Sequence, residues 1–223
     1  MPKILKVSCI MPTKNRAHFV RKSIKMFKNQ SYPNKELVII DDSDEPQNIK
    51  TTDEIQYIHY TNSCSIGSKR NIGISRASGD VILLWDDDDY HGSDRIANQI
   101  AALVRSKKHG IVYNTCVYYN LPSETMYVLP QKIHNELWKY GYIAGTFMFY
   151  KKLFTIGIKF KNQNFREDIL FIEDILNRGF KIATFKIPAG DFVYVKHDAS
   201  SMKVNDAYAH KTLKISKKDF YSL

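Results

Sequence analysis

The pattern that most narrows the fold is a series of short apolar strands that end in polar or acidic residues and are separated by helical segments. Residues 4–11, 36–40 and 80–85 are apolar runs of strand length, and residues 17–29, 65–78 and 94–107 have helical patterns or helix-capping signals. Strands alternating with helices predict βαβ units. We therefore expect an α/β fold with a mostly parallel central sheet flanked by helices.

The strand ends also predict where a ligand binds. The three runs stop at Thr13-Lys14-Asn15, at Asp41-Asp42 and at Asp86 to Asp89. Ligands of open α/β sheets bind at the carboxyl ends of the strands. Because three separate strands end in this way, we expect the site at one edge of the sheet.

After residue 108 the pattern changes. Residues 110–120 and 125–129 have strand-like sequences, a helix is expected over 132–140, and residues 166–178 form an amphipathic helix that ends at Gly179. Closing strands are expected over 181–187 and 192–195. No linker or repeat divides the chain, so we expect one domain over residues 1–223.

Composition excludes several classes of protein. The chain is 43% apolar and 25% charged, which is typical of a globular protein and excludes a disordered one. The longest strongly apolar run, Val81 to Trp85, is far below the about 20 residues of a membrane span. No signal-peptide pattern opens the chain, and its three cysteines form no CxxC pair. We therefore expect a cytoplasmic protein without a transmembrane segment.

The net charge of +10 leaves three kinds of partner open: nucleic acid, an anionic membrane surface and a phosphorylated small molecule. The surplus is spread along the chain, which is typical of a solvated basic surface. It is locally enriched in the tail at Lys203, Lys211, Lys214, Lys217 and Lys218. That tail is compatible with a peripheral membrane contact or a dimer contact, and no nucleic-acid-binding module is recognisable.

Four consecutive aspartates, Asp86 to Asp89, carry the strongest chemical signal. Like charges so close together repel, and stability does not require them. Carboxylate oxygens suit Mg²⁺ or Mn²⁺, which often bridge one or two carboxylates to a substrate's phosphates. In an extended segment alternate side chains share a face, so Asp86 and Asp88 are expected to point the same way.

An ordered set of motifs resembles family 2 glycosyltransferases of the GT-A fold, the Rossmann-like fold of nucleotide-diphospho-sugar transferases. The set runs from about residue 4 to residue 202. Its members are residues 7–16 (VSCIMPTKNR) for the opening strand, 37–43 (LVIIDDS) for the second strand, 67–73 and 77–80 (GSKRNIG and ASGD) for the segment before the metal motif, 86–89 for the DxD element, and 166–168 with Gly179 for the ED helix.

For the nucleotide, the resemblance implies a pocket lined by Thr13, by the backbone around Pro12 and by Asn15. Asp42 would accept a hydrogen bond from the base. The alternative role, for its neighbour Asp41, is to cap the end of the strand. The resemblance divides the chain into a nucleotide-binding half over about residues 1–108, an acceptor-side half over about 109–202 and a basic tail over 203–223.

For the diphosphate, the resemblance implies a bound Mn²⁺ or Mg²⁺. Asp88, with Asp86, would ligate the metal, and Asp86 or Asp87 would hold the ribose. Arg70 would lie near the phosphates or the sugar, where a bidentate guanidinium suits them. His197 resembles a late histidine placed against the metal. Because four aspartates are consecutive, the resemblance also allows metal ligands that are shifted by one residue along the run.

For the acceptor, the resemblance implies that Asp168 is the general base and that Glu167 helps to position the acceptor. Glu173 and Asp174 form a second acidic pair in the same helix, but the distance to Gly179 favours the first pair. These roles describe a metal-dependent inverting glycosyltransferase that moves a sugar from a nucleotide-diphosphate donor, expected to be a UDP-sugar, to a hydroxyl of a glycan, protein or lipid-linked acceptor.

Two other functional hypotheses are compatible with the sequence. A nucleotidyltransferase or another metal-dependent nucleotide-sugar enzyme would also need carboxylates and a metal, but it would be expected to carry a Gly-rich phosphate loop that is not visible here. A non-catalytic binding domain with a basic surface is the third reading, and a steep salt dependence of nucleic-acid binding would favour it.

Overall fold

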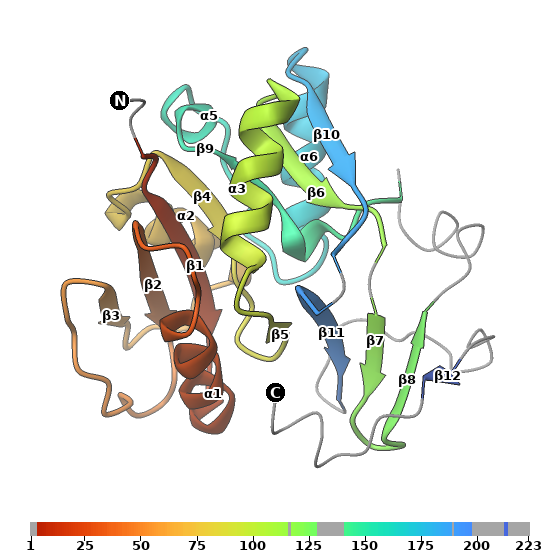
Figure 1. Ribbon diagram of the computed structural model, residues 1–223. Coiled ribbons are helices and arrows are strands. Elements are labelled where there is room, and N and C mark those ends of the chain that lie inside the picture. Colours follow the sequence, from red (N-terminus) through yellow and green to blue (C-terminus); the bar gives the residue numbers. More distant parts are fainter. Residues whose placement is uncertain (1–3, 116, 129–140, 189, 198–211, 214–223) are drawn as a thin grey trace.

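A computed structural model of the chain describes residues 4–115, 117–128, 141–188, 190–197 and 212–213. Figure 1 shows the elements in chain order. The helices are α1 (Ala17–Lys28), α2 (Ile66–Arg76), α3 (Arg95–Ser106), the short α5 (Lys152–Thr155) and α6 (Glu167–Asn177), with a 3₁₀ turn η2 at Ala144–Thr146.

The larger sheet has seven strands and is mostly parallel, as the sequence predicts. Its order is β10-β6-β9-β4-β1-β2-β3, and only β9 runs antiparallel to its neighbours. The bounds are β1 (Val7–Thr13), β2 (Lys35–Asp41), β3 (Ile55–His59), β4 (Val81–Leu84), β6 (Gly110–Tyr113), β9 (Met148–Tyr150) and β10 (Ile182–Phe185).

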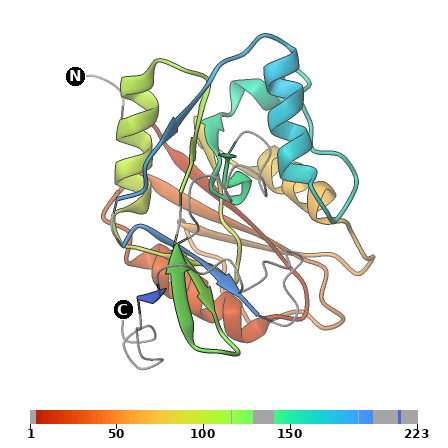
Figure 2. The ribbon, with the colours of Figure 1, turned by 90° about the vertical axis from the view of Figure 1, so that its right-hand side faces the viewer.

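Helices cover both faces of this sheet. Alternate residues of β1 point to opposite faces, so Cys9 packs with Phe27 of α1 and Leu103 of α3, while Ile10 packs with Ile74 of α2 and residues of α6. Figure 2 shows α3 on one side of the strands and α2 and α6 on the other. The core strands are buried on both faces, which explains their continuous apolar runs.

A second sheet of five strands lies beside the carboxyl ends of β1 and β4 (Figure 1). Its order is β12-β8-β7-β11-β5, and only the β7–β11 pair is parallel. The bounds are β5 (Tyr90–His91), β7 (Val117–Asn120), β8 (Thr125–Val128), β11 (Phe192–Lys196) and β12 (Thr212–Leu213).

Some sequence expectations need correction. The strand expected over residues 110–120 is two strands, because β6 pairs in the large sheet and β7 in the small one. The first strand, expected over residues 4–11, begins at Val7 and continues to Thr13, which pairs with Asp41. The helix expected over 132–140 and nearly all of the basic tail lie outside the described residues.

Candidate active site

The polar ends of β1, β2 and β4 meet at one edge of the large sheet, as their sequence predicts. Parallel pairing places Thr13 beside Asp41 and aligns β1 with β4. The hydroxyl of Thr13 donates a 2.5 Å hydrogen bond to Oδ2 of Asp87, just beyond β4. Both side chains are buried. The strand-end motifs are therefore one physical site.

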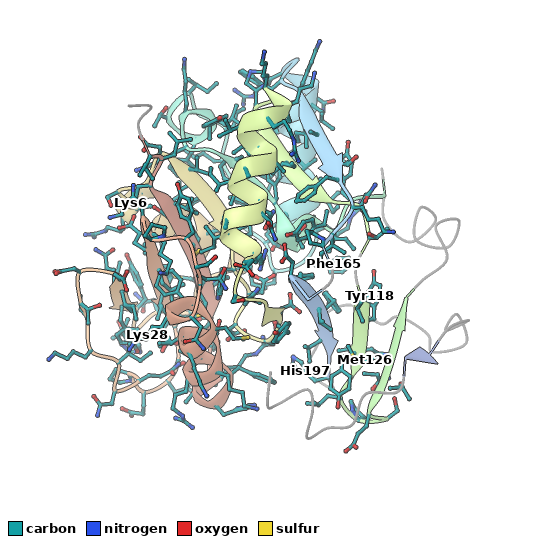
Figure 3. The ribbon with its side chains drawn as sticks, in the orientation of Figure 1. Lys6, Lys28, Tyr118, Met126, Phe165 and His197 are labelled. Carbon is teal, nitrogen blue, oxygen red and sulfur yellow. The ribbon has the colours of Figure 1, made fainter. Side chains whose placement is uncertain are left out.

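Arg16 is the centre of a cluster of charges at this edge. Its Nη1 lies 3.1 Å from Oδ1 of Asp87 and 2.8 Å from Oδ2 of Asp88. The Nε2 of His197, just after β11, is 2.8 Å from the same Asp88 oxygen. Phe19 of α1 packs against the His197 ring, with the ring centroids 5.0 Å apart. The small sheet thus closes one side of the site (Figure 3 labels His197).

Arg70 joins the aspartate turn at the end of β4 to the acidic pair at the start of α6. It lies on α2 with only 3% of its surface exposed. Its Nη2 is 3.0 Å from Oδ1 of Asp86 and 3.3 Å from Oε1 of Glu167. Its Nε and Nη1 are buried and have no hydrogen-bond partner among the residues that the structure describes. A guanidinium with two free N–H-bearing nitrogens is suited to bind a further anion at this point.

The carboxylate of Asp42 is enclosed by donors. Lys69 of α2 contacts it at 2.5 Å, and the backbone N–H of Cys64 donates to it at 2.8 Å. Burial would raise the pKa of Asp42, but the hydrogen bonds from Lys69 and Cys64 hold it below its ordinary value. Lys69 also donates to the carbonyl of Thr13 at 2.9 Å, which ties Asp42 to the end of β1.

Asp41 has the capping role that the sequence left as an alternative. Its Oδ1 accepts from the backbone N–H and the hydroxyl of Ser43, and its Oδ2 accepts from Gln47 and Tyr57. These contacts close the turn that follows β2. Asp41 is fully buried, and both of its carboxylate oxygens accept hydrogen bonds from within the protein.

Asn15 lies at the rim of a pocket beside these groups. Its φ is 52°, its N–H donates to Ser43 at 2.7 Å, and its amide exchanges hydrogen bonds with Asp44. The pocket has a volume of about 310 Å³ and is lined by Asn15, Arg16 and Ala17 with Ser43, Asp44, Glu45 and Gln47. Of the residues expected to line the nucleotide pocket, Asn15 therefore contacts this cavity.

The four aspartates form a turn rather than an extended segment, which corrects the expectation that Asp86 and Asp88 simply share a face by alternation. Asp86 turns to Arg70, while Asp87 and Asp88 share Arg16. Asp89 faces inward and accepts from the backbone N–H of Val195 at 3.0 Å, so it anchors β11.

The cluster holds more negative charge than its neighbours neutralise. Burial raises the pKa of Asp87, and the charge of Asp88 raises it further against the opposing effect of Arg16. Burial and then Asp88 likewise raise the pKa of Asp89. Burial also raises the pKa of Asp86, which Arg70 partly offsets. Such an excess of carboxylate oxygens is chemically suited to a divalent cation.

The donor atoms around the four aspartates determine whether a metal ion fits this site. Within the described ranges, no three His, Cys, Asp or Glu side chains come together in a group that could hold a metal ion. Asp88 and His197 are in contact, but the nearest partner of Asp86 is Arg70. Mg²⁺ is commonly held by one or two carboxylates plus substrate phosphates. The donor set therefore fits a hard cation that arrives with a diphosphate.

The acceptor-side pair opens α6. Arg166 has a left-handed φ of 61° just before the helix, and Glu167 and Asp168 occupy the first turn. Acidic residues are stabilised at this end of a helix. Glu167 is buried against Arg70, and burial raises the pKa of Glu167 to about 7. Asp168 is half-buried and accepts a local bond from the N–H of Ile169 at 2.7 Å.

Sequence reasoning missed three basic side chains of this site. Arg16 and Lys69 lie inside the recognised motifs, next to Asn15 and Arg70. Their position beside predicted site residues is the sequence signal that could have identified them. Arg95 is completely buried and contacts Nδ1 of His91, whose Nε2 is 2.9 Å from the carbonyl oxygen of Asp86. Burial and then Arg95 lower the pKa of His91, so a neutral imidazole supports the turn.

The family model for "Glycosyl transferase family 2" matches residues 8–166, which include the ends of β1, β2 and β4. The chain belongs to glycosyltransferase family 2. The sequence resemblance is thereby confirmed. A curated relative from Escherichia coli, the UDP-Glc:alpha-D-GlcNAc-diphosphoundecaprenol beta-1,3-glucosyltransferase WfgD, is 29% identical over 60% of this chain and 55% of its own.

Solved structures of GT-A-type glycosyltransferases have a similar fold. The TarS fragment 1–349 of S. aureus in complex with UDP has a TM-score of 0.65 at 18% identity, covering 86% of this chain and 61% of that one. The mannosyltransferase PcManGT of Pyrobaculum calidifontis, in complex with GDP-Man and Mn²⁺, has a TM-score of 0.63 at 17% identity, covering 87% and 57%.

The family 2 chain spans less than two thirds of the length of the curated relatives that it matches. No helix in its described ranges has both the length and the apolar character needed to cross a bilayer.

Proposed function

We propose that this family 2 chain is a metal-dependent inverting glycosyltransferase that uses a UDP-sugar and a lipid-linked acceptor. The observation that carries the proposal is the position of Arg70. One buried guanidinium contacts Asp86, at the end of β4, and Glu167, at the start of α6. The donor-side and acceptor-side motifs are therefore within the reach of a single side chain, as a transfer between two substrates requires.

The donor would lie along the strand ends, in the nucleotide-binding half over about residues 1–108. Pro12, Thr13 and Asn15 would line the base and ribose pocket, with Asp42 held ready by Lys69 to accept from the base. Asp87 is fixed by Thr13 and Arg16, so it is pre-oriented for the ribose. The two unpartnered nitrogens of Arg70 would donate to the diphosphate or the sugar.

Asp88 and His197 would hold Mn²⁺ or Mg²⁺ together with oxygens of the diphosphate, and Asp86 would join them by exchanging its contact with Arg70 for the metal. Supporting this are the 2.8 Å contact of His197 with Asp88 and the excess carboxylate charge of the cluster. A bound divalent cation would stabilise the negative charge that develops on the leaving diphosphate. The Mn²⁺ in the complex of PcManGT belongs to that protein and agrees with this assignment.

On the acceptor side, in the half over about residues 109–202, Asp168 would accept the proton of the acceptor hydroxyl. The hydroxyl oxygen then forms a bond to the anomeric carbon, and the bond from that carbon to the diphosphate breaks on the opposite face, which inverts the configuration. Glu167 is occupied by Arg70, so it is suited to position groups rather than to take the proton. Within the described ranges, Asp168 forms no ion pair with a cation.

Two similar proteins support the proposed donor and acceptor classes. The Escherichia coli relative is named for UDP-glucose and a diphosphoundecaprenol-linked acceptor, and the TarS fragment was solved with UDP. The segment from Gly141 to Phe149 would shape the sugar pocket. A side chain added at Gly145 would come within 2.9 Å of Oδ2 of Asp86, so this segment closely approaches the site.

The test is calorimetric titration of UDP and of GDP into the protein, with Mn²⁺ and with a chelator. Metal-dependent binding of UDP in preference to GDP is the expected result. A following assay with UDP-sugars and a lipid-diphosphate-linked sugar should yield a product of inverted anomeric configuration by NMR. Failure of both nucleotides to bind would refute the donor assignment, and a retained configuration would refute the role of Asp168.

A further inference from the structure

The exposed face of α1 carries four cations and His18. At 100° per residue, Arg21, Lys22, Lys25 and Lys28 fall within an arc of about 120°, and all four side chains are exposed. We call these four residues the α1 basic stripe. The opposite face buries Val20, Ser23 and Phe27 in the core. The helix has 12 residues, so the stripe runs for about 18 Å along the surface; Figure 3 labels Lys28 at its end.

Helix stability accounts for only part of this arrangement: Lys25 and Lys28 lie in the last turn, where cations are favourable, but Arg21 and Lys22 do not. The helix contains no acidic residue, and Arg21 and Lys25 are like charges at a spacing of four, which is destabilising. In the described part of the chain, Arg21, Lys25 and Lys28 form no ion pair. Burial lowers the pKa of the neighbouring His18, and the charges of Lys22 and Arg21 lower it further. Within the described structure, the charges of Arg21, Lys25 and Lys28 are thus available to an external anion.

The same helix forms part of the candidate active site. Arg16 immediately precedes it and contacts Asp87 and Asp88, and Phe19 in its first turn packs against His197. A surface that binds the stripe would therefore lie next to the site. If the acceptor is lipid-linked, as proposed above, that surface is the membrane that carries it.

We propose that the α1 basic stripe binds the anionic surface of a lipid bilayer and holds the active site beside the membrane. The biological purpose of this membrane contact rests on the proposed lipid-linked acceptor. Its physical basis, the charge of the α1 basic stripe, does not. A cluster of four or more Lys or Arg on one helix face is typical of binding to anionic lipids, and each adds roughly fivefold in affinity near the surface. His18 is the one exposed ring within this arc, and no Phe, Tyr or Trp side chain of α1 lies there for a nucleic-acid base to stack on, which favours lipid over RNA.

The test is flotation of the full chain with vesicles, without donor or acceptor. Vesicles of phosphatidylcholine containing phosphatidylglycerol should bind the protein, vesicles of phosphatidylcholine alone should not, and high salt should abolish binding. The variant Arg21→Gln/Lys25→Gln/Lys28→Gln should bind roughly a hundredfold more weakly, since it loses three charges of the stripe. Arg21→Lys/Lys25→Arg/Lys28→Arg keeps the charges and should bind like the unaltered chain.

A matched control separates the stripe from net charge. Lys50→Gln/Arg105→Gln/Lys181→Gln removes the same number of exposed charges elsewhere. Its affinity for anionic vesicles should fall by no more than a few-fold. Equal losses in the two triple variants would overturn the proposal, as would failure of the unaltered chain to bind anionic vesicles. Tighter binding to a single-stranded RNA, lost in the stripe variant, would reassign the surface to nucleic acid. UDP titration reports on the proposed function separately, because it involves no lipid.

Discussion

Arg70 and Glu167 come from distant parts of the chain, and their side chains meet at 3.3 Å in the interior. The same guanidinium is 3.0 Å from Asp86. This places a buried cation between two carboxylates whose pKa values burial raises above their ordinary range. The contact between the two halves of the site is therefore electrostatic, and it depends on one side chain.

Replacing Arg70 with Met should lower both stability and activity. Asp86 and Glu167 would then be buried without a cation, and breaking a buried ion pair costs about 3 kcal/mol or more. Urea unfolding and a transfer assay measure the two effects. Arg76→Met on the exposed end of the same helix is the control and should change neither. An Arg70→Met protein with full stability and activity would contradict the bridging role.

Asp168→Asn should leave UDP binding intact and reduce transfer by roughly a hundredfold to ten-thousandfold, because the amide cannot accept the acceptor's proton. Calorimetry and initial-rate measurements separate the two. Asp174→Asn, which lies on the same helix and contacts Arg178 at 3.0 Å, is the matched control and should retain activity. Equal losses in the two variants would show that the base is not Asp168.

Asp88→Ala should abolish the Mn²⁺ dependence of UDP binding, because Asp88 is the carboxylate in contact with His197. Titration of UDP with Mn²⁺ and with chelator checks this, and Asp53→Ala, an exposed position, serves as the control. Metal-dependent UDP binding that is unchanged in Asp88→Ala would mean that the metal is held elsewhere.

Arg16→Gln should raise the affinity for Mn²⁺ measured without nucleotide, by roughly tenfold. Arg16 lies 2.8 Å from Asp88 and competes with any cation for that carboxylate. Free Mn²⁺ can be followed by electron paramagnetic resonance, with Arg21→Gln on the exposed face of α1 as the control. Weaker Mn²⁺ binding in Arg16→Gln than in the control would show that Arg16 does not compete with the metal.

Glu36 should make the fold sensitive to acid. It accepts hydrogen bonds from Ser8, Ser78 and Gly79 and contacts Lys6 at 3.0 Å, near the amino ends of β1 and β2. Burial would raise the pKa of Glu36, but these donors lower it from 4.5 to about 2. Because the folded pKa is depressed, the stabilisation is complete above about pH 4.5 and is lost as the pH falls toward 2.

Glu36→Gln should therefore reduce the free energy of unfolding at neutral pH by about 2 kcal/mol and flatten its decline in acid. Urea unfolding at a series of pH values measures both effects. Glu54→Gln, half-exposed on the neighbouring connection, should behave like the unaltered protein. UDP binding should be unaffected, since Glu36 lies at the opposite strand ends from the site. An unchanged acid dependence in Glu36→Gln would exclude this role.

The alternation of apolar strands and helices in the sequence correctly predicts the mostly parallel large sheet and the edge at which Thr13, Asp42 and Asp86 gather. These features follow from local periodicity and from the geometry of parallel strands, which brings all carboxyl ends to one side. The order of the motifs was also enough to predict the family, which the family model confirms.

Only the tertiary structure decides which charges pair. The sequence predicted that Asp86 and Asp88 face the same way, yet Asp86 contacts Arg70 and Asp88 contacts Arg16 and His197. Likewise β6 and β7 are adjacent in the chain but belong to different sheets. Burial and distance between remote segments determine these pairings, because the interaction of two charges depends on their separation and surroundings in space and not on their spacing along the chain.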